Sequence, residues 1–94
     1  MIKMESFKGE DKGKIVLYGL STCGWCANTK KFLQEMNLSY SFVDVDLLTG
    51  EDSQTAMNEI ERWNPMMTFP TIVINDKVCI VGYDTEGILG AISQ

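Results

Sequence analysis

The 94-residue sequence contains no histidine, and it has only two prolines and three cysteines. A tetrahedral zinc site needs four ligands, usually cysteine and histidine, so three thiols without a histidine argue against such a site within one chain. Three cysteines also cannot all pair with one another, which argues against the disulfide framework of a small secreted protein. The composition therefore favours a catalytic or buried role for the cysteines.

The sequence also lacks long apolar runs and an excess of positive charge. No apolar stretch approaches the length that crosses a membrane, and residues 1–14 lack the apolar centre of a signal peptide. The net charge of −5 argues against nucleic acid or an anionic membrane surface as a partner. We therefore expect a cytoplasmic, monomeric protein whose cysteines are kept reduced between turnovers.

The most informative motif is Cys23-Gly24-Trp25-Cys26, between a strand-like and a helix-like run. In thiol–disulfide exchange, a thiolate attacks a substrate disulfide and a nearby second thiol resolves the mixed disulfide. At a helix start, the first cysteine lies near unpaired N–H groups and the positive end of the helix dipole, which favour the thiolate. We therefore predict Cys23 as the nucleophile and Cys26 as the resolving thiol. The alternative of a purely structural disulfide stays open, although so short a ring would stabilise the fold weakly.

The hydrophobic pattern predicts the element order β-α-β-α-β-β-α. Strands are expected at residues 14–18, 40–46, 71–74 and 78–81, and helices at residues 23–37, 51–64 and 85–93. A strand–helix–strand crossover makes the first two strands parallel, and the final hairpin adds an antiparallel pair. The prediction is an α/β fold with a four-stranded mixed sheet covered by three helices. Residues 1–13 are expected to form a mobile arm before a domain of residues 14–94.

Three finer expectations concern single residues. The buried face of the first helix is expected to carry Thr29, Phe32, Leu33 and Met36. Ser21 or Thr22 is expected to cap that helix at its N-terminus. Cys79 lies on a predicted strand, and we expect it to be a core residue.

Three motifs occur in a fixed order along the chain: the run from Tyr18 to Cys26, then Thr68-Phe69-Pro70-Thr71, then Val81-Gly82-Tyr83-Asp84. Together they resemble the glutaredoxin family of the thioredoxin fold, over residues 14–94. The resemblance implies a thiol–disulfide oxidoreductase of electron transport and cell redox homeostasis. It implies that a reductase supplies electrons and that protein or small-molecule disulfides receive them.

The resemblance also implies a substrate-binding set around the cysteines and a cis bond before Pro70. The set consists of Trp25, Thr68, Phe69, Pro70, Gly82 and Asp84. The backbone of Phe69 is expected to pair with an extended substrate, as in β-augmentation. Asp84 is expected to meet an amino group, and Trp25 to shape the docking surface beside the thiolate.

The departures from the family pattern concern glutathione. Gly24-Trp25 replaces the usual Pro-Tyr, and Leu20 and Met67 stand where glutathione-using members carry cationic or polar groups. Both lost groups would face a glutathione carboxylate. We therefore expect no cofactor, weak glutathione binding, and a flavoprotein or ferredoxin-linked reductase as the donor. The alternative is an iron–sulfur cluster held between two chains by the same cysteines. The second cysteine counts against it, because family members best known for clusters have one cysteine and use glutathione as a ligand.

Overall fold

A five-stranded mixed sheet organises residues 2–93, the part of the chain that the computed structural model describes. The strands are β1 (Glu5–Phe7), β2 (Ile15–Gly19), β3 (Tyr40–Asp44), β4 (Thr71–Ile74) and β5 (Val78–Val81). They lie side by side in the order β1-β3-β2-β4-β5. Only β2 and β3 are parallel neighbours, and the other three pairs are antiparallel. The mixed sheet and its parallel pair agree with the prediction.

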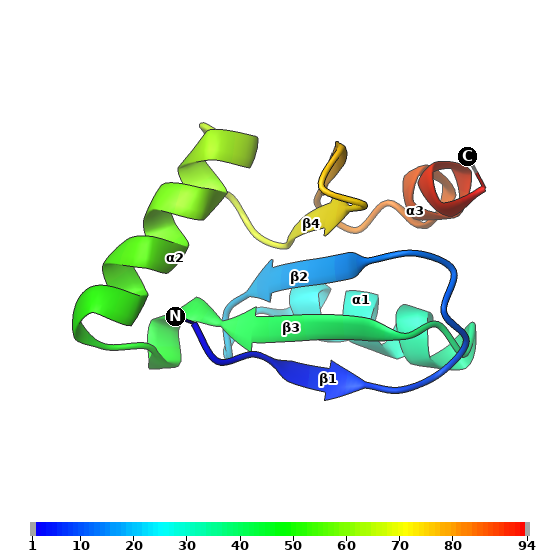
Figure 1. Ribbon diagram of the computed structural model, residues 1–94, viewed down its shortest axis with the longest axis horizontal. Coiled ribbons are helices and arrows are strands. Elements are labelled where there is room, and N and C mark those ends of the chain that lie inside the picture. Colours follow the sequence, from blue (N-terminus) through cyan, green and yellow to red (C-terminus); the bar gives the residue numbers. More distant parts are fainter. Residues whose placement is uncertain (1, 94) are drawn as a thin grey trace.

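Three helices and a short 3₁₀ turn complete the fold. They are α1 (Gly24–Glu35), the 3₁₀ turn η1 (Val45–Leu47), α2 (Gly50–Trp63) and α3 (Thr85–Ile92). Figure 1 shows β1, β3 and β2 side by side, with α1 behind them. The predicted α/β class and the three helices are confirmed.

The two faces of the sheet bury separate apolar cores. In β2, Ile15 and Leu17 face a core that α1 and α3 cover, while Val16 and Tyr18 face a core that α2 covers. Side chains of a strand alternate between faces, so a central strand covered on both sides is apolar at every position. This explains why β2 reads as a continuous apolar run. The C-terminal end of β2 leads into the cysteine motif.

The sheet has five strands where the sequence predicts four. The additional strand β1 pairs with β3, with Glu5 opposite Phe42 and Phe7 opposite Tyr40. The following loop is tied down as well, because the amide of Glu10 donates to the carbonyl of Asn37 at 2.7 Å. A strand of three residues is too short to show a period of two, so the pattern predicted an arm there. Pairing with the otherwise open edge of β3 holds this segment in place as a strand.

Two element ends differ from the prediction by two residues, and one of these differences moves a side chain. α1 ends at Glu35, and Met36 is exposed rather than on the buried face. Asn37 has a φ of 54°, which turns the chain out of the helix. Leu38 then takes the place in the core, 3% exposed. The second predicted strand likewise stops at Asp44, because residues 45–47 form η1.

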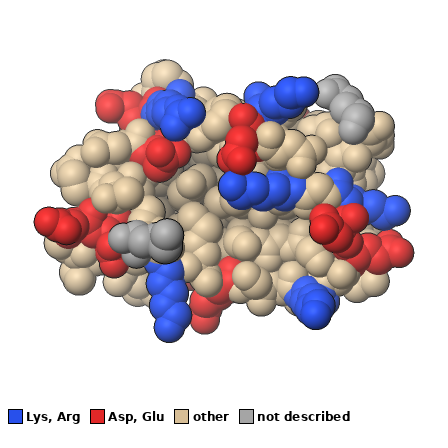
Figure 2. All heavy atoms as spheres, in the orientation of Figure 1, with Lys and Arg blue, Asp and Glu red and all other residues tan. Residues whose placement is uncertain are grey.

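The surface carries both signs of charge without a continuous patch of either on the face that Figure 2 shows. No helix within residues 2–93 is long and apolar enough to cross a membrane.

Candidate active site

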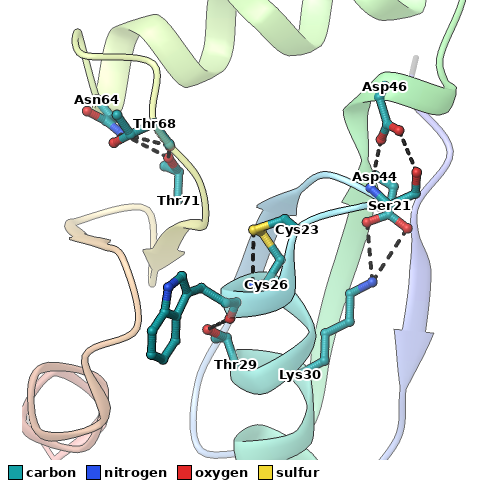
Figure 3. The surroundings of a disulfide bond; sticks show 11 residues. Ser21, Cys23, Cys26, Thr29, Lys30, Asp44, Asp46, Asn64, Thr68 and Thr71 are labelled. Atoms are coloured by element: carbon teal, nitrogen blue, oxygen red, sulfur yellow. Dashed lines mark hydrogen bonds and ion pairs between the residues drawn. A yellow bond between two sulfur atoms is a disulfide. The ribbon is translucent and has the colours of Figure 1, made fainter.

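The two cysteines of the motif form a disulfide at the point where β2 leads into α1 (Figure 3). Cys23 is the N-cap of α1, with extended backbone angles, and its Sγ accepts a hydrogen bond from the amide of Cys26 at 3.1 Å. The prediction that Ser21 or Thr22 caps the helix is therefore wrong. The sulfur of Cys23 itself reaches the free amide of the first turn, and this places a helix N-terminus at the reacting atom.

Burial separates the two sulfurs. Cys26 is 0% exposed, because it lies inside the first turn of α1 against Gly19 of β2. Cys23 is only partly buried. A large disulfide substrate can therefore approach Cys23 and not Cys26. The division into an attacking Cys23 and a resolving Cys26 stays a prediction, and this difference in burial is the feature on which it depends.

The loop before β4 brings a second segment to the site. Its Phe69–Pro70 peptide bond is cis, as the resemblance implied. Within residues 2–93, neither the N–H nor the C=O of Phe69 takes part in a hydrogen bond. The carbonyl of Pro70 accepts from the amide of Gly82 at 2.9 Å, so the loop and the turn after β5 lie together. Three of the predicted substrate-binding residues are thus neighbours.

A buried asparagine that the sequence analysis missed holds this loop. Asn64, at the end of α2, is 4% exposed. Its Nδ2 donates to the carbonyl of Thr68 at 3.1 Å, to Thr68 Oγ1 at 3.1 Å and to Thr71 Oγ1 at 3.0 Å, and its Oδ1 accepts from the amide of Met66 at 3.2 Å. Figure 3 shows the three side chains converging. The only signal in the sequence is an asparagine directly before Pro65, which reads as an ordinary helix end.

A hollow of about 320 Å³ opens beside the cysteines. It is lined by Trp25, Phe69, Gly82 and Tyr83, and we call it the aromatic hollow. The rings of Trp25 and Tyr83 stack with centroids 5.5 Å apart, and Trp25 is nonetheless 61% exposed. A larger hollow of about 420 Å³ lies near the start of β2 and contains none of the predicted site residues. The aromatic hollow therefore brings together three of the predicted substrate-binding residues, Trp25, Phe69 and Gly82.

Asp84 is the last of the predicted substrate-binding residues, and Leu20 and Met67 are the positions where the sequence departs from the family pattern. Asp84 caps α3, and its carboxylate accepts from the amide of Gly87 at 2.9 Å. Leu20 and Met67 are half-buried against the core under α2, whereas Met66 is exposed. No cation therefore stands at the Leu20 or Met67 positions.

Cys79 is half-buried rather than a core residue, which corrects the prediction. It lies on β5, the edge strand of the sheet, where the core under α2 does not close over it. Partial burial raises the pKa of its thiol. A raised pKa lowers the thiolate fraction, so Cys79 is the less reactive kind of thiol.

A carboxylate fastens the turn before Cys23. Asp46 accepts hydrogen bonds from the hydroxyl of Ser21 and from its amide, the latter at 2.8 Å, and these bonds lower the pKa of Asp46. A carboxyl whose pKa is lowered by folding stabilises the fold above its ordinary pKa, and that stability is lost as the pH falls through the folded value.

We therefore expect Asp46→Asn to lower stability at pH 7 and to have no effect in acid. The measurement is urea unfolding of both proteins at pH 7 and well below the ordinary carboxyl value of 3.8. A stability difference that persists unchanged in acid would mean that the asparagine acts through something other than the lost charge.

Comparison with known proteins places these features in a family. A model of the family described as glutaredoxin matches residues 15–79. The glutaredoxin of Ricinus communis is 30% identical over 64 residues, which are 67% of this chain and 60% of that protein. Mitochondrial glutaredoxin-2 of Mus musculus is 29% identical over 75 residues, 77% of this chain and 45% of that protein. The chain thus spans about half the length of these curated relatives.

Two solved structures are similar over nearly the whole chain. The glutaredoxin from Methanosarcina mazei Go1 is 39% identical with a TM-score of 0.90, covering 99% of this chain and 90% of that one. The methanoredoxin of Methanosarcina acetivorans is 44% identical with a TM-score of 0.86, covering 92% of this chain and 90% of that one. The predicted thioredoxin-like fold is confirmed by these similarities.

Proposed function

This chain belongs to the glutaredoxin family of thiol–disulfide oxidoreductases, and we propose that it is a dithiol redoxin in which Cys23 attacks and Cys26 resolves. One observation carries the proposal. The Cys23–Cys26 disulfide stands at a helix N-terminus, with one sulfur accessible and the other fully buried. A two-step exchange requires this difference in exposure, because the substrate must reach the attacking sulfur and the resolving sulfur must wait beside it.

In the proposed cycle the reduced protein gives two electrons to a substrate disulfide. The Cys23 thiolate attacks one substrate sulfur, the substrate disulfide breaks, and one substrate thiolate leaves. Cys26 then attacks Cys23 Sγ, which forms the Cys23–Cys26 disulfide and releases the second substrate thiolate. The amide of Cys26 donates a hydrogen bond to Cys23 Sγ, and the positive end of the α1 dipole lies at the same atom. Both favour the thiolate form of Cys23.

Several surface features support protein disulfides as substrates. The free backbone groups of Phe69 are suited to an extended peptide, which would add to them by main-chain hydrogen bonds. Trp25, between the two cysteines in the sequence, and Tyr83, which stacks on it, are exposed large apolar side chains. Apolar side chains exposed together beside a reactive group favour a docking surface there.

The direct test mixes the reduced protein with a protein disulfide in the absence of other thiols. Mass spectrometry should find the substrate reduced and this chain carrying the Cys23–Cys26 disulfide. A reduced chain that leaves accessible protein disulfides intact would refute the proposal.

We further expect glutathione to reduce the oxidised protein slowly, because Leu20 and Met67 offer no cation to its carboxylates. A hydrogen bond to a charged group contributes about 1.5–3 kcal/mol, so Leu20→Lys should accelerate reduction by glutathione about tenfold or more. Leu20→Met, which adds length without charge, is the matched control and should leave the rate unchanged. The measurement is the rate of dithiol formation against glutathione concentration. Fast, saturable reduction of the unaltered protein would contradict this expectation.

The iron–sulfur alternative places a cluster between two chains on the same cysteine site. Among the described residues, no group of three or more cysteine, histidine, aspartate or glutamate side chains gathers that could hold a metal ion, so further ligands would come from a second chain or from glutathione. Visible absorbance after anaerobic purification would reveal such a cluster.

A further inference from the structure

The outer side of β5 is an open strand edge. β5 ends the strand order of the sheet, so within residues 2–93 it pairs only with β4. Its sequence, Val78-Cys79-Ile80-Val81, contains no charge and no proline, and its register with β4 has no bulge. Figure 1 shows the hairpin of β4 and β5, in yellow and orange, between α2 and α3. Nothing in the disulfide chemistry described so far uses this edge.

The opposite edge of the sheet differs from β5 in its protection. Proteins protect open edges from pairing with other chains by short strands, charged side chains, proline or bulges. β1 is only three residues long, contains Glu5 and is flanked by Lys3 and Lys8. β5 is longer and has none of these charges, and Val81 at its end is 48% exposed. An unprotected edge of this kind favours pairing with a further strand.

The hydrogen-bond pattern of the hairpin shows which backbone groups of β5 are free. The amide of Gly82 donates to the carbonyl of Pro70 at 2.9 Å, which continues the register of β4 and β5. In an antiparallel pair, residues that bond to the neighbouring strand alternate with residues whose backbone groups point away from it. Ile80 therefore bonds to β4, and the N–H and C=O groups of Cys79 and Val81 point outward. A strand that pairs with this edge would bond to these two residues.

The two ends of β5 carry opposite charge. Lys77, just before the strand, is exposed and forms no ion pair within residues 2–93, whereas the neighbouring Asp76 is already paired with Lys14 at 3.1 Å. After the strand come Asp84 and Glu86, which are both exposed. A second copy of β5 in antiparallel orientation would bring each positive end against a negative end. The charges therefore favour a second copy of this chain as the partner of the edge.

We propose that two copies of this chain form a dimer through β5, in which their sheets join edge to edge about a two-fold axis at Ile80. In this register Cys79 of each copy lies opposite Val81 of the other, and each of these pairs exchanges two main-chain hydrogen bonds. The interface is small because β5 has four residues, so the dimer is weak and reversible. It replaces the monomer expected from the sequence.

Sedimentation velocity from micromolar to millimolar protein concentration is the direct test. A reductant keeps Cys79 as a free thiol, so that no disulfide between chains can form. The average mass should rise with concentration from the 10.6 kDa of one chain toward twice that value. A mass that stays at one chain up to millimolar concentration would overturn the proposal.

Val81→Lys should weaken the association by about tenfold or more, because the edge then carries like charges on both copies. Val81 is exposed, so the fold should tolerate the change. Leu47→Lys is the matched control, since Leu47 is 68% exposed on η1 and its replacement changes the net charge equally. It should associate like the unaltered protein. Equal losses in the two variants would mean that net charge rather than the β5 edge controls association, and the proposal would be wrong.

Opposite charges at Val81 test whether the two copies meet at this strand. In the proposed register the two Val81 side chains lie on the same face of the joined sheet, diagonally across the axis, within reach of long side chains. Val81→Lys and Val81→Glu should each remain monomeric alone, and an equimolar mixture of the two should associate. A mixture in which the two variants stay separate would contradict the proposed pairing.

Amide hydrogen exchange on the unaltered protein tests the register and needs no variant. The outward amides of Cys79 and Val81 should exchange about tenfold more slowly at a concentration where about nine copies in ten are dimeric, because pairing closes them to water. The amide of Ile80, which bonds to β4, should be protected at every concentration. Protection that rises with concentration along β1 instead of β5 would place the interface at the other edge and refute the proposal.

Discussion

We expect Cys23→Ser to abolish disulfide reduction by this protein. The buried Cys26 cannot approach a large substrate, and a serine hydroxyl is not ionised at neutral pH, so no nucleophile remains at the surface. The loss should amount to the whole activity toward protein disulfides. The measurement is the initial rate of protein disulfide reduction under a chemical reductant that regenerates the dithiol.

Serine in place of Cys26 should have the opposite signature. Cys23 still attacks but nothing resolves the product, so a mixed disulfide with the substrate should accumulate on Cys23 and be visible by non-reducing electrophoresis. Cys79→Ser is the control and should keep nearly full activity, because Cys79 is half-buried on β5. Trapping of substrate on Cys26 in the Cys23→Ser protein would reverse the assignment of the two thiols.

Alanine in place of the buried Asn64 is expected to lower the stability of the fold strongly. The variant loses a side chain that is 4% exposed and that donates to Thr68 and Thr71. Each buried hydrogen bond contributes about 0.5–1.5 kcal/mol net, so the free energy of unfolding should fall by about 2–3 kcal/mol. The measurement is the urea midpoint and slope.

Asn58→Ala is the matched control for this change. Asn58 lies on the same helix but is exposed and accepts only from Gln54 at 3.0 Å, so its loss should change stability by less than about 0.5 kcal/mol. Activity gives a second readout. The loop that carries Phe69 should lose its position, so binding of protein disulfides should weaken while small disulfides still react with Cys23. Equal stability of the two variants would show that Asn64 does not hold the loop.

Local pattern alone was enough for most of the architecture. The hairpin strands at residues 71–74 and 78–81 were predicted with their observed ends, because short apolar β-rich runs flank a polar turn. The cysteine motif and its place before α1 also follow from neighbours in the sequence. These features depend on residues that lie close together along the chain, where spacing and geometry are tightly linked.

The pattern was wrong where a distant segment decides the structure. β1 exists because β3 offers it an open edge, and the second predicted strand ends at Asp44, where the η1 turn begins and Asp46 accepts a hydrogen bond from Ser21 in another part of the chain. Met36 fits the helical period and is nonetheless exposed, because the chain leaves α1 just before it. The spacing of apolar residues describes one helix or strand by itself. It carries no information about the segments that pack or pair with that element.

The sequence by itself determined that this chain carries a dithiol redox motif at a strand–helix junction, because that motif is four consecutive residues in a recognisable setting. Only the tertiary structure decided how far each sulfur is buried and which side chain holds the Phe69 loop. Asn64 is an ordinary helix-end residue in its own segment. It acquires its role because the loop after α2 folds back over it, so that its side chain is buried and bonded to both Thr68 and Thr71.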